Sequence, residues 1–233
     1  IMSGYDERDP TALRERPPEL LVALDGGVRG LRIAWSPDFG YAVVDPEVQK
    51  ITATAVHAFV DQGCTVDEVN LVWEPAWEAF WTLFPANAYA AYEHLLEENA
   101  DEISGFTADI LRTGAAVTGA QYAAALGRMD LLRSDFARVF QTYDLLVSPT
   151  TAVTAFQICQ RPRQIAGRDV DPFWEFAPFT FPVNMAGCPA ASVPCGLSSE
   201  GLPVGLQLIG RRGEESVLLA AAAAFEETRQ WAD

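Results

Sequence analysis

Apolar residues along the chain fall into short runs and into longer stretches with helical spacing. The run at residues 31–35 ends before a Ser-Pro pair and predicts a short buried strand. Asp45 followed by Pro46 predicts a helix start, because an Asp side chain caps free backbone N–H groups and proline is tolerated in the first turn. Apolar residues then recur at helical spacing as far as Gly63, and residues 67–72 predict a second strand. This order is typical of parallel strands joined by a right-handed crossover.

Helical patterns dominate the middle of the chain. They begin at Pro75 and continue over residues 88–98 and 118–140. Three tryptophans recur at four-residue spacing around the first helix start: Trp73, Trp77 and Trp81. This spacing favours a stripe that faces the core, with the wall of a binding cleft as the alternative. The acidic residues between 97 and 102 are interpreted as a solvated helix end rather than a metal site.

Three short apolar runs and a final helical stretch complete the pattern: residues 145–148, 191–194, 204–209 and 214–229. The polar residues 157–172 predict a surface loop. Together, these elements predict an α/β protein with part of a mixed, mostly parallel central sheet that is flanked by helices on both faces. Residues 1–29, rich in Pro, Asp and Arg, predict an extended connector, which leaves residues 30–233 as the folded part.

Composition argues against several kinds of function. Acidic residues outnumber basic ones by 32 to 16, and the formal net charge of −16 argues against binding to nucleic acid. Four scattered cysteines and two histidines make a zinc site improbable, so neither a metal nor another cofactor is expected. No apolar run is long enough to cross a membrane, and free thiols favour a cytoplasmic location.

The most specific sequence feature lies near the C-terminus. Residues 179–196 read Phe-Thr-Phe-Pro-Val-Asn-Met-Ala-Gly-Cys-Pro-Ala-Ala-Ser-Val-Pro-Cys-Gly, and residues 201–212 read Gly-Leu-Pro-Val-Gly-Leu-Gln-Leu-Ile-Gly-Arg-Arg. Because the residue before a proline avoids the helical region, the segment leading to Pro182 predicts an extended approach to a turn. Both stretches resemble the C-terminal signature of amidase-signature enzymes.

Other segments resemble motifs of the same family in the same order: residues 9–11, 31–35, 44–46 and 143–151. The resemblance therefore covers essentially the whole chain and implies the amidase-signature fold. It implies that residues 30–233 are the C-terminal part of an amidase domain. Residues 1–29 would then connect this part to an N-terminal part.

The resemblance also implies a Ser–cis-Ser–Lys triad, in which a lysine accepts a proton and a serine attacks the amide carbonyl. This chain has a single lysine, Lys50, which we expect to face solvent, and one adjacent serine pair, Ser198-Ser199, without a glycine-rich loop. In the family the triad lies upstream of the motif at residues 9–11. We therefore expect no catalytic residue here, and we expect the opening Ile-Met-Ser-Gly to lie inside a longer protein.

A Cys–His pair is the other nucleophile to consider. The candidates are Cys188, Cys195, His57 and His94, but nothing in their spacing supports a pair. Buried structural thiols are the preferred interpretation.

By resemblance, the helix at 118–140, the turn at 149–151 and the approach at 179–184 should lie near the substrate. The candidate substrate-binding residues combine aromatic rings with hydroxyl and amide groups: Tyr122, Thr150, Thr151, Trp174, Phe179, Thr180 and Asn184. For Asn184, a side chain that ties down its own loop is the alternative. Such a wall predicts an uncharged or aromatic amide as substrate.

The leading hypothesis is the C-terminal portion of an amidase that converts a small carboxylic amide into an acid and ammonia or an amine. Its partner would be the N-terminal half that carries the triad, so the chain alone is predicted to be inactive; a homodimer is compatible with the sequence. An alternative is the glutamine-using subunit of a tRNA amidotransferase, which typically has an acidic residue shortly before the Phe-Thr pair. Here residues 176–178 are Phe-Ala-Pro, and Glu175 is the nearest acid.

An alternative of another class is a non-catalytic remnant that binds ligands or partners. Such a remnant would expose open sheet edges and apolar faces, which is physically unfavourable.

Overall fold

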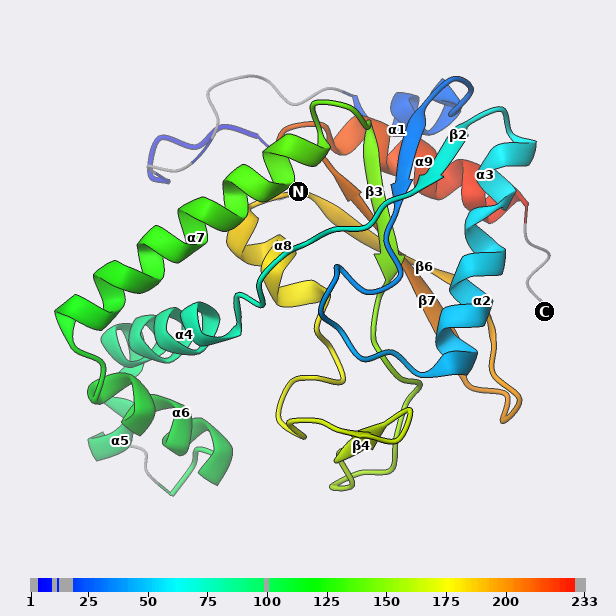
Figure 1. Cartoon of the computed structure of the whole chain (residues 1–233). Helices are drawn as coiled ribbons and strands as arrows, with labels where there is room; N and C mark the ends of the chain where they lie inside the picture. The colour runs from blue at the N-terminus through cyan, green and yellow to red at the C-terminus, as the bar shows by residue number, and fades with distance from the viewer. Residues whose placement is uncertain (1–3, 10–11, 13–18, 99–100, 229–233) are drawn as a thin grey trace.

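A computed structural model of the chain describes residues 4–9, 12, 19–98 and 101–228 (Figure 1). Several sequence predictions lie partly outside these residues, among them the connector at 1–29 and the last residue of the helix predicted at 214–229. The motif at residues 9–11, of which only Asp9 is described, and the opening Ile-Met-Ser are also affected.

The centre of the molecule is a five-stranded sheet with the order β2-β1-β3-β7-β6. The strands are β1 (Arg32–Trp35), β2 (Thr65–Glu68), β3 (Leu145–Pro149), β6 (Ala190–Leu197) and β7 (Pro203–Gly210). β1 pairs in parallel with β2 and β3, whereas β7 pairs antiparallel with β3 and β6. Only β7 therefore runs against the other four strands, and the prediction of a mixed, mostly parallel sheet is confirmed.

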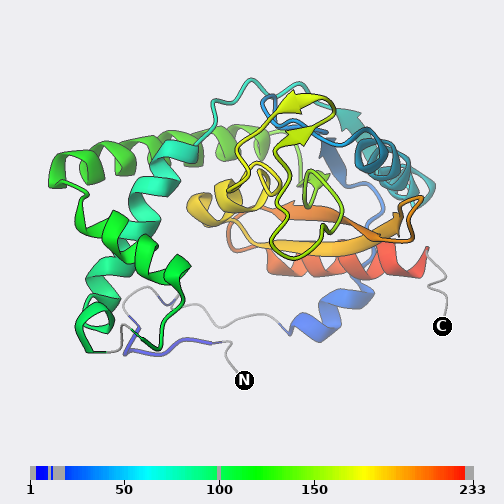
Figure 2. The same ribbon diagram turned by 90° about the horizontal axis from the view of Figure 1, so that it is seen from below.

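Helices cover both faces of this sheet, as predicted. In Figure 2, α2 (Pro46–Val56) and α9 (Glu215–Glu227) lie on opposite sides of β6 and β7. The start of α2 is the expected one, since the Asp45 carboxylate accepts hydrogen bonds from the backbone N–H groups of Glu47 (2.8 Å) and Val48 (3.3 Å). The short α3 (Ala58–Asp61) follows and ends before Gly63, which has a positive φ of 88°.

Four helices form a lobe at one side of the sheet (Figure 1). They are α4 (Trp77–Tyr92), α5 (Leu95–Glu98), α6 (Gly105–Ala115) and α7 (Gly119–Val139). The helix predicted at residues 88–98 is thus divided between α4 and α5. α7 begins with a reciprocal capping box between Thr118 and Gln121, and it matches the predicted helix at 118–140.

Two predicted extended segments differ in the structure. The strand expected at residues 67–72 is β2, which ends at Glu68. Its neighbour β1 is followed by Pro37, which has no N–H to donate. The last hydrogen bond between the two strands therefore joins the Val69 N–H to the Trp35 carbonyl. The extended approach expected at residues 179–182 is instead the start of the short helix α8 (Thr180–Ala186). Pro182 is tolerated there because the N–H groups of the first helical turn have no intrahelical partner.

Short elements fill two segments that were expected to be irregular. α1 (Leu20–Ala23) and the 3₁₀ helix η1 (Leu24–Gly26) lie within the predicted connector and pack against α9. The predicted surface loop at 157–172 contains a small hairpin of β4 (Gln164–Ile165) and β5 (Arg168–Asp169). No helix in the described part of the chain is both long and apolar enough to span a membrane.

An aromatic cluster around Phe39 joins the sheet to α7 and α8. The Phe39 ring is fully buried, with ring centroids 5.2 Å from Trp73, 5.1 Å from Phe179 and 6.4 Å from Phe136. Its φ of 52° lies in the left-handed region, and the next residue, Gly40, would place a Cβ 1.7 Å from a backbone oxygen of Leu71. This turn therefore needs glycine, and it aims the following residues at the candidate site.

Candidate substrate-pocket wall

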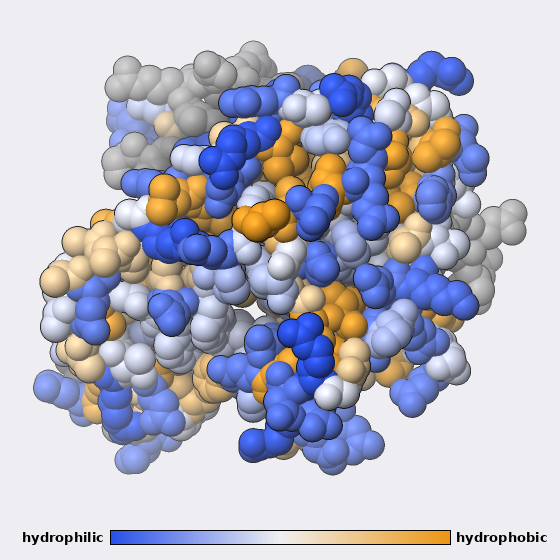
Figure 3. Space-filling model, viewed as in Figure 1, coloured by the Kyte–Doolittle hydropathy of each residue, from blue (hydrophilic) through white to orange (hydrophobic). Residues whose placement is uncertain are grey.

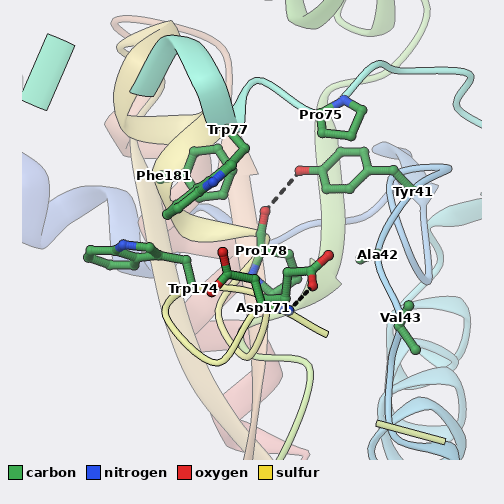
Figure 4. Close-up of a pocket in the computed structure, with 10 residues that line it drawn as sticks. Tyr41, Ala42, Val43, Pro75, Trp77, Asp171, Trp174, Pro178 and Phe181 are labelled. Carbon is green, nitrogen blue, oxygen red and sulfur yellow. Dashed lines mark hydrogen bonds between the residues drawn. The ribbon is translucent and has the colours of Figure 1, made fainter. Parts of the chain in front are cut away.

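A pocket of about 220 Å³ lies between the turn after β1, the start of α4 and the segment before α8. Figure 4 shows Tyr41 and Val43 on one side and Trp77, Phe181 and Trp174 on the other, with Asp171 and Pro178 between them. The lining residues are Tyr41, Ala42, Val43, Pro75, Trp77, Asp171, Trp174, Glu175, Pro178 and Phe181.

Aromatic rings form the main wall. The Trp77 ring lies 5.6 Å from each of Phe181, Trp174 and, in a stacked arrangement, Trp81, measured between centroids. Trp73, by contrast, is buried against Phe136, with centroids 4.6 Å apart. The tryptophan row thus serves both roles considered for it: Trp73 belongs to the core, and Trp77 lines the pocket.

Tyr41 closes the opposite side of the pocket. Its hydroxyl donates a hydrogen bond to the Pro178 carbonyl at 2.8 Å, which ties the turn after β1 to the segment before α8. Burial raises the pKa of the Tyr41 phenol well above its ordinary value, so this side chain stays protonated at neutral pH. It can hold the wall in place, but it cannot act as a base there.

Two carboxylates give the pocket a negative rim. Asp171 accepts a hydrogen bond from the Phe173 N–H at 2.8 Å, and the Glu175 carboxylate accepts one from the Asp171 N–H. Within the described chain neither acid forms an ion pair, and none of the lining residues is basic. The rim should therefore repel anionic groups.

Of the seven candidate substrate-binding residues, only Trp174 lines this pocket. Its indole Nε1 is buried without a hydrogen-bond partner among the described residues. The ring of Phe179 lies in the core, where the Phe179 carbonyl accepts a hydrogen bond from the buried Gln207 side chain at 3.2 Å. Thr180 follows as the first residue of α8 and is half-buried.

The other four candidates lie outside the pocket. The Thr150 hydroxyl bonds to Ser192 (2.7 Å), and the Thr151 hydroxyl donates to the Val153 carbonyl (2.8 Å). Both hydroxyls therefore have partners within the chain.

Tyr122 and Asn184 differ in their surroundings. The Tyr122 hydroxyl, on α7, donates to Asn87 of α4 at 2.9 Å. The Asn184 side chain is exposed, and no side-chain hydrogen bond joins it to any described residue, so nothing shows it tying down its own loop.

Sequence reasoning did not name Tyr41, Asp171 or Phe181 as pocket residues, although Phe181 lies in the approach at 179–184 that was expected near the substrate. The Trp77 spacing was a usable signal, since it raised a cleft wall as an alternative. Tyr41 had no such signal, because its direction depends on the Phe39-Gly40 turn, whose backbone angles are set by tertiary packing.

The described residues provide no activated nucleophile. Lys50 is exposed on α2, and Ser199 lies in the turn between β6 and β7, where its N–H and hydroxyl bond to the Glu47 carboxylate. Burial raises the pKa of the Cys188 thiol to about 11, against a smaller opposing effect of Arg212, while His57 and His94 are exposed. Nor does any group of three His, Cys, Asp or Glu in the described ranges form a metal site.

Comparisons with known proteins agree with this fold. The amidase family model matches residues 1–219. An acylamidase from Rhodococcus erythropolis is 34% identical over 240 residues, covering 100% of this chain and 50% of the relative. A glutamyl-tRNA(Gln) amidotransferase subunit from Syntrophomonas wolfei is 35% identical over 259 residues, covering 99% of this chain and 51% of the relative.

Solved structures show the same relationship. A bacterial aryl acylamidase of the amidase-signature family superposes with a TM-score of 0.86 at 29% identity, over 98% of this chain and 49% of that protein. A glutamyl-tRNA(Gln) amidotransferase subunit from Thermotoga maritima gives 0.67 at 26% identity, over 96% of this chain and 48% of that protein. The fold and these matches define an amidase-signature protein. This chain belongs to the amidase family, and it spans about half the length of the curated relatives that it matches.

Proposed function

We propose that this chain is the C-terminal portion of an amidase that hydrolyses a carboxylic amide to an acid and ammonia or an amine. The Ser–cis-Ser–Lys triad would be carried by an N-terminal half, and this chain would supply part of the substrate-pocket wall. The observation that carries the proposal is the aromatic pocket around Trp77 in a chain that belongs to the amidase family. The described residues contain this aromatic pocket but no activated nucleophile, as expected of a part that supplies only the wall.

In the proposed reaction, a serine of the N-terminal half attacks the amide carbonyl and forms an acyl-enzyme while the C–N bond breaks. The amine leaves with a proton delivered through the triad, and water then releases the acid and restores the serine. The wall of this chain would hold the substrate's apolar part beside the reacting carbonyl, and its contribution is orientation.

The shape of the sheet supports a missing partner half. β2 and β6 are the edges of the described sheet, so each has one strand neighbour in the order given above. Beyond β2, the side chain of Val72 is 90% exposed. Unpaired sheet edges and exposed apolar side chains favour association with another part of the protein.

The pocket supports an uncharged, apolar or aromatic group as the bound part of the substrate. Trp77, Trp174 and Phe181 offer apolar area, whereas Asp171 and Glu175 disfavour an anionic group. The high structural similarity to an aryl acylamidase is consistent with an aromatic amide.

The glutamine-using subunit of a tRNA amidotransferase is the second candidate. One observation favours it: Glu175, the nearest acid before the Phe-Thr pair, lines the pocket. The three residues between Glu175 and Phe179 are not acidic, which argues against this branch. A non-catalytic binding remnant, the third candidate, would keep the pocket and lack any turnover.

Co-expression with an N-terminal half that carries the triad tests the proposal. A fluorophosphonate probe should label that half and leave this chain unlabelled, and the complex should hydrolyse an aryl amide such as p-nitroacetanilide faster than it releases ammonia from glutamine. Preferred release from glutamine would instead favour the amidotransferase. Labelling of this chain, or no turnover of either amide, would overturn the amidase assignment.

Trp77→Ala tests the wall itself. Loss of an apolar pocket contact should lower kcat/KM for the aryl amide by at least about tenfold. Tyr92→Ala is a matched control, since Tyr92 also lies on α4 but is exposed and outside the pocket. An equal effect of both variants would show that Trp77 acts through helix stability alone, and a thermal unfolding midpoint for each variant measures that contribution.

A further inference from the structure

A second pocket, of about 340 Å³, lies beside the β4–β5 hairpin. We call it the arginine pocket; its lining residues are Cys159, Gln160, Arg161, Arg163, Pro172 and Phe173. The space-filling view shows strongly hydrophilic residues over the hairpin at the bottom of the molecule (Figure 3). This volume is within the range of small-molecule sites.

The Arg161 guanidinium lies against two phenyl rings that also contact each other, with ring centroids 5.5 Å apart. Its central carbon lies 5.0 Å from the ring centroid of Phe173 and 5.6 Å from that of Phe106, within the range of cation–π contacts. Both rings lie on one side of the guanidinium, and no side-chain hydrogen bond or ion pair joins it to a described residue, so its N–H groups remain available to a ligand. These ring contacts restrict the exposed Arg161 side chain on one side, so a planar partner that binds its N–H groups finds part of the side-chain freedom already lost.

The charge of the pocket is unusual for this chain. Acidic residues outnumber basic ones by 32 to 16, and arginines on α6 and α7 pair with acids three residues away, such as Arg112 with Asp109 and Arg133 with Asp130. Neither Arg161 nor Arg163 forms an ion pair with a described residue, and no carboxylate lines the pocket. The residues that line the arginine pocket therefore carry two positive charges and no negative one.

The turn at residues 171–175 separates this positive pocket from the negative one described above. Asp171 and Glu175 face the substrate-pocket wall, while Pro172 and Phe173 face the arginine pocket. The bond from Phe173 N–H to Asp171 fixes the shape of this turn. The two pockets should thus select ligands of opposite charge.

We propose that the arginine pocket binds a small organic carboxylate with an apolar or aromatic body. A carboxylate matches the planar N–H edge of a guanidinium and can accept two hydrogen bonds from it. The ring of Phe173 and the side chain of Pro172 provide an apolar surface for the rest of the ligand. This assignment does not depend on the proposed amidase activity, because every group in it belongs to this chain.

Benzoate is the probe for this site, with benzyl alcohol as its neutral analogue, and binding is followed by isothermal titration calorimetry at constant ionic strength. We expect benzoate to bind and benzyl alcohol to bind at least about tenfold more weakly, since a charge-assisted pair is lost. Equal binding of the two probes would overturn the proposal. Sulfate at the same ionic strength should displace benzoate poorly, and efficient displacement would overturn the carboxylate assignment.

Substitutions locate the site. Arg161→Gln and Arg163→Gln should each weaken benzoate binding, and Arg161→Lys should restore it only in part, because lysine keeps the charge but lacks the planar fork. Arg212→Gln is the matched control, since Arg212 is also exposed and unpaired among the described residues but lies outside the pocket. Unchanged binding in Arg163→Gln and Arg161→Gln, or an equal loss in Arg212→Gln, would overturn the assignment. Thermal unfolding midpoints identify any variant that fails to fold.

Discussion

Burial sets the chemistry of individual side chains, and the cysteines show this most directly. Because only the thiolate reacts, a pKa of about 11 leaves roughly one Cys188 in a thousand reactive at pH 8. Cys159 is exposed, so we expect it to react with Ellman's reagent within seconds at pH 7.5 while Cys188 reacts slowly. The Cys188 rate should rise about tenfold per pH unit between pH 8 and 10. Cys188→Ser should remove this pH-dependent phase, and rapid reaction of Cys188 at pH 7.5 would contradict the prediction.

At the residue scale, sequence reasoning succeeded where local chemistry decides the outcome. The helix starts at Asp45 and Thr118 could be predicted, because a capping side chain accepts a hydrogen bond from a backbone N–H only two or three residues further along the chain. Phe179 shows the limit of this reasoning. It was chosen as an aromatic pocket residue, but the packing of Phe39 and the bond from Gln207 place its ring in the core.

At the element scale, α4 and α6 approach each other through a single glycine. A Cβ on Gly114 would lie 2.0 Å from the carbonyl oxygen of Pro85, so the two helices would have to separate. We expect Gly114→Ala to lower the free energy of unfolding by about 1–3 kcal/mol. Gly127→Ala is the matched control, because Gly127 lies within α7 and its Cβ would meet open space. This control should raise the free energy of unfolding by up to about 1 kcal/mol.

Urea denaturation of both variants measures these changes. A neutral Gly114→Ala would mean that the α4–α6 contact is looser than the structure shows. A destabilising Gly127→Ala would mean that a group outside the described contacts packs on α7.

The two elements that sequence reasoning misplaced have different causes. β2 ends at Glu68 because β1, its partner, ends before Pro37, and a single-strand pattern carries no information about where a neighbour stops. The start of α8 was predicted to be extended because a residue before proline usually avoids the helical region. This is only a tendency, and a proline is tolerated in the first turn of a helix, as Pro182 is here. By contrast, β3 and β7 were placed well, since central strands are buried on both faces and read as continuous apolar runs.

At the scale of the whole molecule, the open edges of the sheet can report whether an N-terminal half joins it. If an N-terminal half completes the enzyme, its presence should slow amide hydrogen exchange at β2 or β6, whose outer N–H groups pair with no described strand. β3, in the middle of the sheet, is the internal control, and its exchange should be slow with or without the partner. The exposed Val72 should become buried in the complex, so Val72→Asp should weaken association of the two halves. Ile158→Asp is the control, because Ile158 is also highly exposed and apolar, and it should leave association unchanged. Unchanged exchange at both edges would contradict a shared sheet, even if the two chains were found to associate.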